Sequence, residues 1–360
     1  MAPRADIPTK VEFNSHADRY FIAFQPVHVH AIPLDGQTDA DGAVQVDWQG
    51  RTARFVYEYK RSNSPKSLDT ALLRARSYAK RYKMGPLVVA PFLSEEMLKH
   101  FESEKASAID LSGNGLLLAP GLYVWRSGHP SRFKESATAR NVYRGNSSIL
   151  SRCLLLRRDF QSLTELRQFA LDRTFTGNET DEKRRLTKGT VSKVVQCLSE
   201  DKIISHTGRA IQMLDPGRLL EKLRLNYSTP RGTKLIGKSE LPGHLVWRRL
   251  AQNFLRYAST GDGAAERYGL LSCPDKLSIY VDDLERATEV LGVRETSVFP
   301  NIQLMEEKND LVYFDCRVNG DERWASPIQT WLELGNAGPR EQQAAGELEQ
   351  VILNGGSDRL

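Results

Sequence analysis

Short apolar runs and helical stretches alternate through the first 147 residues of the chain. The segments that carry this pattern are Ala43–Trp48, Thr52–Lys60, Leu68–Tyr82, Pro86–Pro91, Ser94–Glu104 and Leu116–Trp125. Strands that alternate with helices are typical of an α/β sheet. The run Pro86–Pro91 is apolar throughout, which indicates a central strand buried on both faces. We therefore predict an α/β sheet domain over residues 1–147.

A different pattern begins near residue 148, where apolar residues recur at helical spacing. Leu163, Leu166 and Phe169 share one face of a first helix. After a polar turn, the stretch 186–198 predicts a second helix with Thr187 as its N-cap. The apolar stripe of this second helix consists of Val191, Val194, Val195 and Leu198. The segment is therefore predicted to be mainly helical.

The opposite face of the second helix is polar and basic, and a hairpin follows it. The hairpin is predicted over residues 202–214, with its turn at Thr207–Gly208. Helix, turn, helix and basic-tipped hairpin resemble, in that order, the winged helix of bacterial regulators, and we predict such a domain over residues 148–230. The resemblance implies DNA binding by Lys188, Thr190, Ser192, Lys193, His206 and Arg209. The alternative is a winged helix used for protein contact or dimerisation.

The last third of the chain returns to a mixture of helices and strands. Residues 228–240 are polar and contain Pro230 and two glycines, which predicts a linker. The segments beyond it are a helical pattern at Leu245–Tyr257, strand-like runs at Leu277–Val281 and Leu311–Cys316, and a closing helix at Pro339–Leu353. We predict a third, α/β domain over residues 241–354. The fold class is thus multidomain α/β.

Net charge adds information about the central region. The chain has 360 residues and a formal net charge of +5. Residues 151–227 contain fifteen Lys or Arg against ten Asp or Glu, and the rest of the chain carries 35 of each sign. The whole positive excess therefore falls within the predicted winged helix. A localised basic patch is typical of a protein that binds a polyanion such as DNA.

Cysteine usage and hydropathy indicate the cellular compartment. Cys153, Cys197, Cys273 and Cys316 are scattered and form no CxxC pair, so we expect buried thiols rather than disulfides or a zinc site. The first residues show no continuous apolar stretch of the kind found in a signal peptide. The chain contains no run close to the roughly 20 apolar residues that span a bilayer. We expect a cytoplasmic protein with no membrane partner.

Three charged residues are predicted to meet on the first hairpin. If Gln49–Gly50 is a two-residue loop, the residues paired across the hairpin are those whose numbers add to 99. Asp41 then lies opposite Glu58, and Lys60 shares their face of the sheet because side chains alternate along a strand. Asp47 is a weaker candidate in this register.

Two neighbouring carboxylates can hold a hard divalent cation such as Mg²⁺ or Mn²⁺. The cation would be held by Asp41 and Glu58, and it can activate water for attack on a phosphate. The ammonium of Lys60 would orient that water or stabilise the growing charge. Two alternatives remain open. The hairpin could carry complementary surface charges, or the domain could be an inactive platform for DNA binding or dimerisation.

These residues resemble the PD-(D/E)xK nuclease superfamily. The matching motif is Asp41 followed by Glu58-Tyr59-Lys60 on the next strand. On the following helix, Arg74 and Tyr78 stand where the superfamily often has a polar residue and a tyrosine, and the apolar strand comes next. The resemblance covers roughly the first 130 residues and implies a metal-dependent DNA endonuclease with Asp41, Glu58 and Lys60 as catalytic residues. It departs from the family because no proline precedes Asp41, and Asp39 could replace Asp41 as a ligand.

A further acidic residue, Asp110, lies shortly before the apolar run Leu116–Trp125. Asp110 and Asn114 flank a tight turn in Ala108–Gly115. They could add a metal ligand or a phosphate contact. Both residue types are ordinary turn formers, and we favour that interpretation.

The C-terminal region has the order of a nucleotidyltransferase. A glycine-rich stretch, Thr260–Gly269, precedes a strand that ends at Asp282 and Asp283. In such enzymes the loop holds a triphosphate and the acids hold Mg²⁺. Adjacent acids on a strand point to opposite faces, so we expect a degenerate copy without transfer activity.

The central and C-terminal regions together resemble AbiEi-type antitoxins of type IV toxin–antitoxin systems. The resemblance covers about 148–350 and rests on the order of the domains, on Ser326–Leu334 and on Pro339-Arg340-Glu341. It implies a transcriptional regulator that represses its own operon and neutralises a toxin. The chain differs from the family by its additional N-terminal domain.

Two hypotheses of different classes follow. The first is an antitoxin-like regulator that binds double-stranded DNA through the winged helix, with a cognate toxin or a second copy of the chain as a further partner. The second is a metal-dependent DNA endonuclease in which the winged helix selects the target and the N-terminal domain cuts it.

Overall fold

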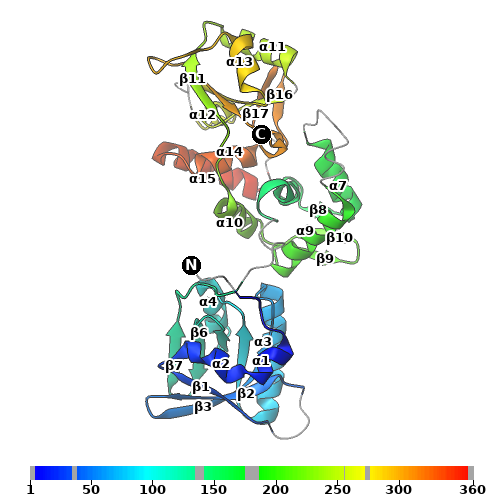
Figure 1. Ribbon diagram of the computed structural model, residues 1–360. Helices are drawn as coiled ribbons and strands as arrows, with labels where there is room; N and C mark the ends of the chain where they lie inside the picture. Colours follow the sequence, from blue (N-terminus) through cyan, green and yellow to red (C-terminus); the bar gives the residue numbers. More distant parts are fainter. Residues whose placement is uncertain are drawn as a thin grey trace. The chain divides into compact units, whose positions relative to one another are not determined.

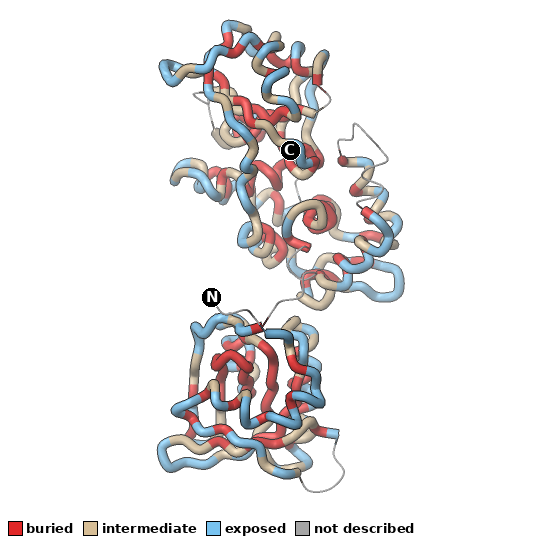
Figure 2. Tube along the Cα trace, viewed as in Figure 1, coloured by how far each residue is buried: buried red, intermediate tan, exposed pale blue. Residues whose placement is uncertain are grey.

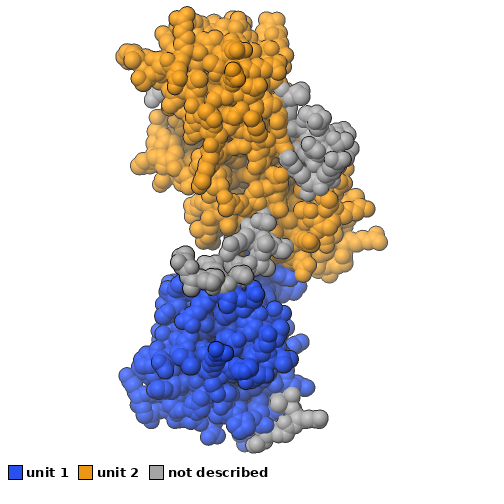
Figure 3. All heavy atoms as spheres, in the orientation of Figure 1, with its two compact units in different colours: residues 1–136, 200–202 blue, residues 137–199, 203–360 orange. Residues whose placement is uncertain are grey.

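The computed structural model describes residues 5–34, 39–133, 142–174, 186–254, 256–271 and 276–355. The chain divides into two compact units, residues 1–136 with 200–202 and residues 137–199 with 203–360 (Figure 3). Within the described residues the protein is a mixed α/β molecule with three sheets, as the pattern of the sequence predicts. Each unit is described by itself below.

The N-terminal unit contains one mixed sheet with the strand order β1-β2-β3-β4-β5-β6-β7 among the described residues (Figure 1). Its strands are β1 (His28–Ile32), β2 (Gly42–Trp48), β3 (Arg51–Tyr59), β4 (Gly85–Ala90), β5 (Ser107–Asp110), β6 (Gly115–Ala119) and β7 (Leu122–Arg126). Its helices are α1 (Lys10–Ser15), α2 (Ala17–Phe21), the 3-10 turn η1 (Ile22–Phe24), α3 (Pro65–Tyr82) and α4 (Glu95–Ser103). Strands β3, β4 and β5 are parallel, and the other neighbouring strands are antiparallel.

Helices cover both faces of this sheet. On one face, Phe13 of α1 and Phe21 of α2 pack with Phe55 and Tyr57 of β3. On the other face, α3 and α4 pack against alternate residues of β4, among them Val88. Burial along the central strands is therefore nearly continuous, which explains their apolar sequences (Figure 2).

The register predicted for the first hairpin is confirmed. Val44 pairs with Phe55 and Val46 with Ala53. Both residues of the loop have positive φ, 48° at Gln49 and 76° at Gly50, as a two-residue hairpin turn of this hand requires. The apolar run Leu116–Trp125 forms two strands rather than one continuous element: it is the hairpin β6–β7, because Pro120-Gly121 forms a turn with φ 72° at the glycine.

The second unit begins with a central segment, residues 142–227. Its elements are the 3-10 turn η2 (Gly145–Ser147), α6 (Ser148–Leu156), β8 (Asp159–Phe160), α7 (Leu163–Asp172), α9 (Lys188–Glu200), β9 (Ile204–Thr207), β10 (Ala210–Met213) and α10 (Pro216–Asn226). Strands β8, β10 and β9 form a small antiparallel sheet in that order. The two helices predicted before the hairpin, α7 and α9, are confirmed.

The second unit continues with a C-terminal segment, residues 234–355. Its strands are β11 (Lys234–Lys238), β12 (Tyr257–Ser259), β13 (Leu277–Val281), β14 (Arg294–Glu295), β15 (Ile302–Glu306), β16 (Arg317–Asn319) and β17 (Glu322–Trp324). Its helices are α11 (Gly243–Asn253), α12 (Asp262–Arg267), α13 (Leu284–Leu291), the 3-10 turn η3 (Asp310–Tyr313), α14 (Pro327–Leu334) and α15 (Pro339–Leu353). The strand order among the described residues is β14-β11-β15-β13-β12-β17-β16.

Some predictions for this segment are confirmed and others are wrong. The strand Leu277–Val281 and the helix Pro339–Leu353 form with the expected bounds. The linker expected over 228–240 is wrong in part, because β11 lies within it and pairs with β14 and β15. The strand expected at Leu311–Cys316 is also wrong, because its first half belongs to η3. Length and apolar character alone do not distinguish such a short run from a helical turn.

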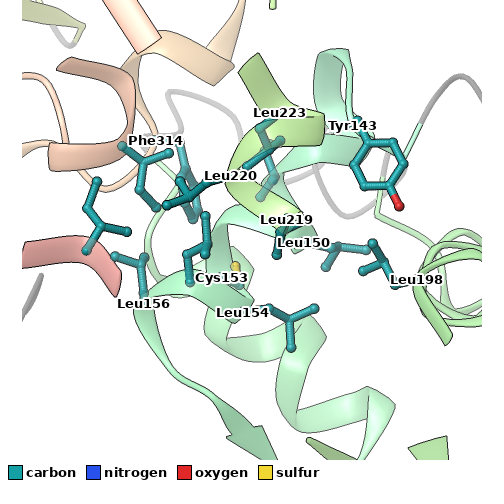
Figure 4. Close-up of a cluster of buried hydrophobic side chains, with 14 of the residues drawn as sticks. Tyr143, Leu150, Cys153, Leu154, Leu156, Leu198, Leu219, Leu220, Leu223 and Phe314 are labelled. Carbon is teal, nitrogen blue, oxygen red and sulfur yellow. The ribbon is translucent and has the colours of Figure 1, made fainter. Parts of the chain in front are cut away.

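The central segment and helices α14 and α15 share one hydrophobic core. Leu150 and Leu154 of α6 pack in one cluster with Leu220 of α10 and with Phe314 of the C-terminal segment (Figure 4). The same cluster includes Trp331 and Leu348. The guanidinium of Arg152, also on α6, is buried within the second unit and donates to the carbonyl of Leu311 (3.2 Å) and to Oε1 of Gln329 (2.9 Å). The two segments therefore form one folding unit.

The described residues contain free cysteines and no candidate membrane span. Cys153, Cys197 and Cys316 are free thiols, and burial raises the pKa of Cys153 and of Cys316. Cys273 lies outside the described residues. Across the described ranges, no helix combines the length and the apolar character needed to cross a bilayer.

Because α6 and α15 share one core, we predict that a destabilising substitution in α15 also destabilises α6. Replacing the fully buried Leu348 with alanine should cost about 2 to 5 kcal/mol, because a cavity opens among side chains from both segments. Amide hydrogen exchange should accelerate across Ser148–Leu156 as well as in α15. Gln343→Ala, an exposed position on the same helix, is the control. Faster exchange confined to α15 in the Leu348 variant would contradict a shared core.

Candidate functional site

The charged residues predicted on the first hairpin meet at the carboxyl end of β3. We call Asp41, Glu58 and Lys60, together with Lys10 and Arg74, the carboxylate cluster. Glu58 has a side chain only 3 % exposed, and its Oε1 accepts from Nζ of Lys60 (2.8 Å) and Nη1 of Arg74 (3.2 Å). Arg74 reaches this oxygen from α3, which packs against β3 and β4. The two cations neutralise a carboxylate that would otherwise be costly to bury.

Asp41 is held from two sides just beyond the end of the β2–β3 ladder. Its Oδ2 accepts the backbone N–H of Tyr59 (2.8 Å), and its Oδ1 forms an ion pair with Lys10. The hydrogen bond to Asp41 raises the pKa of Lys10, and the charge of Glu58 contributes to the same shift. Burial and then the charge of Glu58 raise the pKa of Tyr78, so this tyrosine lies within electrostatic reach of the cluster.

Lys10 is the member of the cluster that was not predicted from the sequence. It is the first residue of α1, whose start is fixed by a capping box between Thr9 and Glu12. The spacing Thr-x-x-Glu is a recognisable signal for a helix start and could have placed Lys10 at the first helical position. It could not have shown that the helix lies against β3.

The carboxylate oxygens of the cluster are partly engaged by partners within the chain. Lys10 and the N–H of Tyr59 take the two oxygens of Asp41, and Lys60 and Arg74 take Oε1 of Glu58. Apart from its ion pair with Lys10, Oδ1 of Asp41 is buried without a hydrogen-bond partner in the described part of the chain, and so is Oε2 of Glu58. Magnesium binds through several oxygens in near-octahedral geometry. Binding of Mg²⁺ or Mn²⁺ by Asp41 and Glu58 would therefore compete with the ion pairs to Lys10, Lys60 and Arg74.

The other acids considered for this site lie apart from the cluster or are exposed. Asp47 accepts from Oγ1 of Thr52 (2.6 Å) near the loop of the hairpin, and this hydrogen bond lowers its pKa. Asp39 is exposed. The described residues contain no group of three or more His, Cys, Asp or Glu side chains placed to hold a metal ion.

Asp110 and Asn114 form a turn, as expected. Oδ1 of Asp110 accepts the backbone N–H groups of Ser112, Gly113 and Asn114 at 2.7–2.8 Å. Its Oδ2 accepts from the N–H of Leu93 and from Nδ2 of Asn114. Burial raises the pKa of Asp110, and these donors oppose that effect. Both oxygens of the Asp110 carboxylate therefore accept hydrogen bonds that stabilise the loop.

Helix α9 separates an apolar from a polar face. Val191, Val194, Val195 and Leu198 are buried, whereas Lys188, Ser192, Lys193 and Gln196 are exposed. Oγ1 of Thr187 accepts the N–H of Thr190 (3.1 Å), which confirms the predicted N-cap. Thr190 is half-buried and its hydroxyl contacts that of Thr187 (3.0 Å), so it is less available than its neighbours.

The hairpin β9–β10 follows α9 and presents the other two predicted residues. Thr207 pairs with Ala210, so the two-residue loop is Gly208–Arg209, with φ 63° at the glycine. The turn predicted at Thr207–Gly208 is therefore shifted by one residue. Arg209 lies at the tip, and His206 lies one pair further back, opposite Ile211; both predicted side chains are exposed.

The acids expected at a degenerate nucleotidyltransferase site both have structural partners. Oδ2 of Asp282 accepts from Nε of Arg256 (3.3 Å). Oδ1 of Asp283 accepts the N–H of Arg286 (3.0 Å) and so caps α13. The segment Ser326–Leu334 forms the buried helix α14 with its N-cap, and its Gln329 contacts Arg152.

Comparison of the chain with protein-family models, with curated proteins and with solved structures gives no match.

The ion pair between Lys10 and Asp41 gives a direct test of the cluster. In Asp41→Asn the pKa of Lys10 should fall, because its largest stabilising partner is lost. The pKa can be followed by the carbon-13 shift of the lysine Cε during a pH titration. Lys99, which pairs with Glu95 on α4, is the internal control and should not change. An unchanged Lys10 titration would show that the pair does not form in solution.

Proposed function

We propose that this protein is a regulator that binds duplex DNA through a winged helix built from α7, α9 and the hairpin β9–β10. The observation that carries the proposal is the division of α9 into a buried valine stripe and an exposed basic and polar face. A recognition helix needs both, because one side holds the fold and the other meets the groove.

The dimensions of α9 suit a major groove. Its thirteen residues give a length of roughly 20 Å at 1.5 Å per residue. Lys188 and Ser192 are four residues apart and therefore share a face, and Lys193 lies beside Ser192. Lysine can donate to guanine or to phosphate, and serine can contact either type of base. The exposed face therefore combines base-reading and phosphate-binding groups.

The hairpin supplies the second contact. Arg209 in the two-residue loop and His206 on β9 both present exposed side chains. Arginine at such a tip binds phosphate and fixes the register of the protein on the duplex without reading sequence. The positive excess of residues 151–227 supports this arrangement, because phosphate neutralisation supplies most of the non-specific affinity for DNA.

The antitoxin-like part of the proposal rests on the resemblance of residues 148–350 to AbiEi-type regulators. The C-terminal segment would then be a nucleotidyltransferase-like domain without transfer activity, which agrees with the structural use of Asp282 and Asp283. A cognate toxin or a second copy of the chain would be the protein partner. The N-terminal unit would be a nuclease-like platform that adds DNA contact or assembly.

The first test removes two basic side chains from α9. Lys188→Ala combined with Lys193→Ala should weaken binding to duplex DNA and lower the slope of log K against log salt by about two, because two phosphate contacts are lost. Fluorescence anisotropy across a salt series measures both quantities. The matched control is Lys234→Ala with Lys238→Ala, two exposed lysines of β11 in the same unit. Equal affinity and slope in the two double variants would remove α9 from the proposal.

A second candidate function is metal-dependent DNA cleavage. Two observations favour it: the register brings Asp41 toward Glu58 as the nuclease resemblance requires, and Oε2 of Glu58 is buried without a hydrogen-bond partner among the described residues. The present pairing of both carboxylates with lysine and arginine counts against it. We therefore rank it below DNA binding without cleavage.

The two candidates differ in a plasmid assay. With Mg²⁺ or Mn²⁺, the wild-type protein should shift supercoiled plasmid without nicking it. If nicking occurs, it should disappear in Glu58→Ala and in Lys60→Ala but persist in Asp47→Asn, a carboxylate of the same hairpin outside the cluster. Nicking with that pattern of loss would make the protein an endonuclease and refute the non-cleaving regulator.

A further inference from the structure

The second unit contains a cavity of about 340 Å³ that neither proposed function uses. It lies between the start of α6, the end of α10 with the residues that follow it, the loop before η3, and α14. Its size falls within the range of sites that hold small organic ligands. The same residues that join the central segment to the C-terminal segment therefore also enclose a space.

The charged residues of the cavity are mainly cationic. Arg144, Arg152 and Arg231 line it together with a single acid, Glu307. One carboxylate oxygen of Glu307, Oε1, accepts a hydrogen bond from the backbone N–H of Asn309 (2.8 Å). Arg144 and Arg231 are exposed and Arg152 is buried, so the cavity has a basic rim and a basic floor.

The buried guanidinium of Arg152 has no carboxylate among its hydrogen-bond acceptors within the described residues. Its Nη1 and Nη2 donate only to neutral acceptors, the carbonyl of Leu311 and the amide oxygen of Gln329. Its Nε has no hydrogen-bond partner in the described ranges. Burial lowers the pKa of Arg152 to about 10, so the group still carries its charge at neutral pH. A buried cation without a directly bonded anion is costly unless something else compensates it.

The carboxylate of Glu333 contributes to the compensation of Arg152, and Gln329 links the two side chains. The amide of Gln329 accepts from Arg152 through Oε1 and donates to Glu333 through Nε2 (2.7 Å). Glu333 also accepts from the hydroxyls of Thr260 and Tyr280 and from the N–H of Gly261 (3.0 Å). The carboxylate of Glu333 is thus hydrogen-bonded mainly to groups other than Arg152.

We propose that this cavity binds a phosphate-bearing small molecule of mononucleotide size. The phosphate would be bound by Arg152 with Arg144 and Arg231, because guanidinium groups match phosphate geometry and strengthen in a water-poor site. The organic part would lie against Leu223, Leu332 and the ring of Tyr227, which line the same space. The site is distinct from the DNA-binding face of α9 and from the carboxylate cluster.

Calorimetry on the full chain, with AMP, adenosine, inorganic phosphate and citrate as probes, tests the proposal. AMP should bind, inorganic phosphate should bind more weakly, and adenosine and citrate should not bind at the same millimolar concentrations. Arg231→Ala and Arg144→Ala should each weaken AMP binding by about tenfold, the effect of losing one charge-assisted contact. Both positions are exposed, so these variants keep the buried network of Arg152 intact.

The control is Arg224→Ala, an exposed arginine of α10 that does not line the cavity. Its AMP affinity should equal that of the wild type. Failure of AMP and phosphate to bind the wild-type protein would overturn the proposal. Citrate binding as tightly as AMP would overturn the phosphate assignment, and equal affinity in all three arginine variants would place binding elsewhere. None of these outcomes depends on whether the protein binds DNA.

Discussion

The burial of α14 and α15 against the central segment is the interaction on which the second unit depends. Helix α6 packs with α10 and with the two C-terminal helices, and the leucines of all these elements form one cluster. A small sheet of three short strands provides only a small part of this core. The C-terminal helices complete that core, and α9 can then leave a whole face exposed. The apolar stripe of α9 belongs to this cluster, and its basic face lies opposite.

The N-terminal unit shows a contrasting use of charge. Its sheet is covered on both faces, and the carboxylates of Asp41 and Glu58 are buried where β3 ends. Burial of two anions is tolerated because Lys10 of α1, Lys60 just after β3 and Arg74 of α3 pair with them. The same arrangement engages Oδ2 of Asp41 and Oε1 of Glu58 in hydrogen bonds within the chain. Charge pairing within the chain and metal binding would therefore compete for the same carboxylates.

Local signals in the sequence predicted local features well. The β2–β3 register followed from a two-residue loop and strict alternation, and the N-cap of α9 followed from Thr187. Features that depend on distant contacts were not predicted. Strand β11 lies in a polar stretch with two glycines and forms because β14 and β15 offer it partners. The pairing of Lys10 with Asp41 and the burial of Arg152 beside Gln329 join residues 31 and 177 positions apart, and nothing in either local sequence indicates them.

Hydrogen exchange of the full chain, with and without duplex DNA, tests the central claim most directly because it reports on both candidate surfaces in one measurement. The account predicts slower exchange on DNA binding in α9 and in the hairpin β9–β10, and unchanged exchange around Asp41 and at the end of β3. Protection confined to the carboxyl end of β3, with α9 and the hairpin unaffected, would contradict the account and move the DNA to the carboxylate cluster.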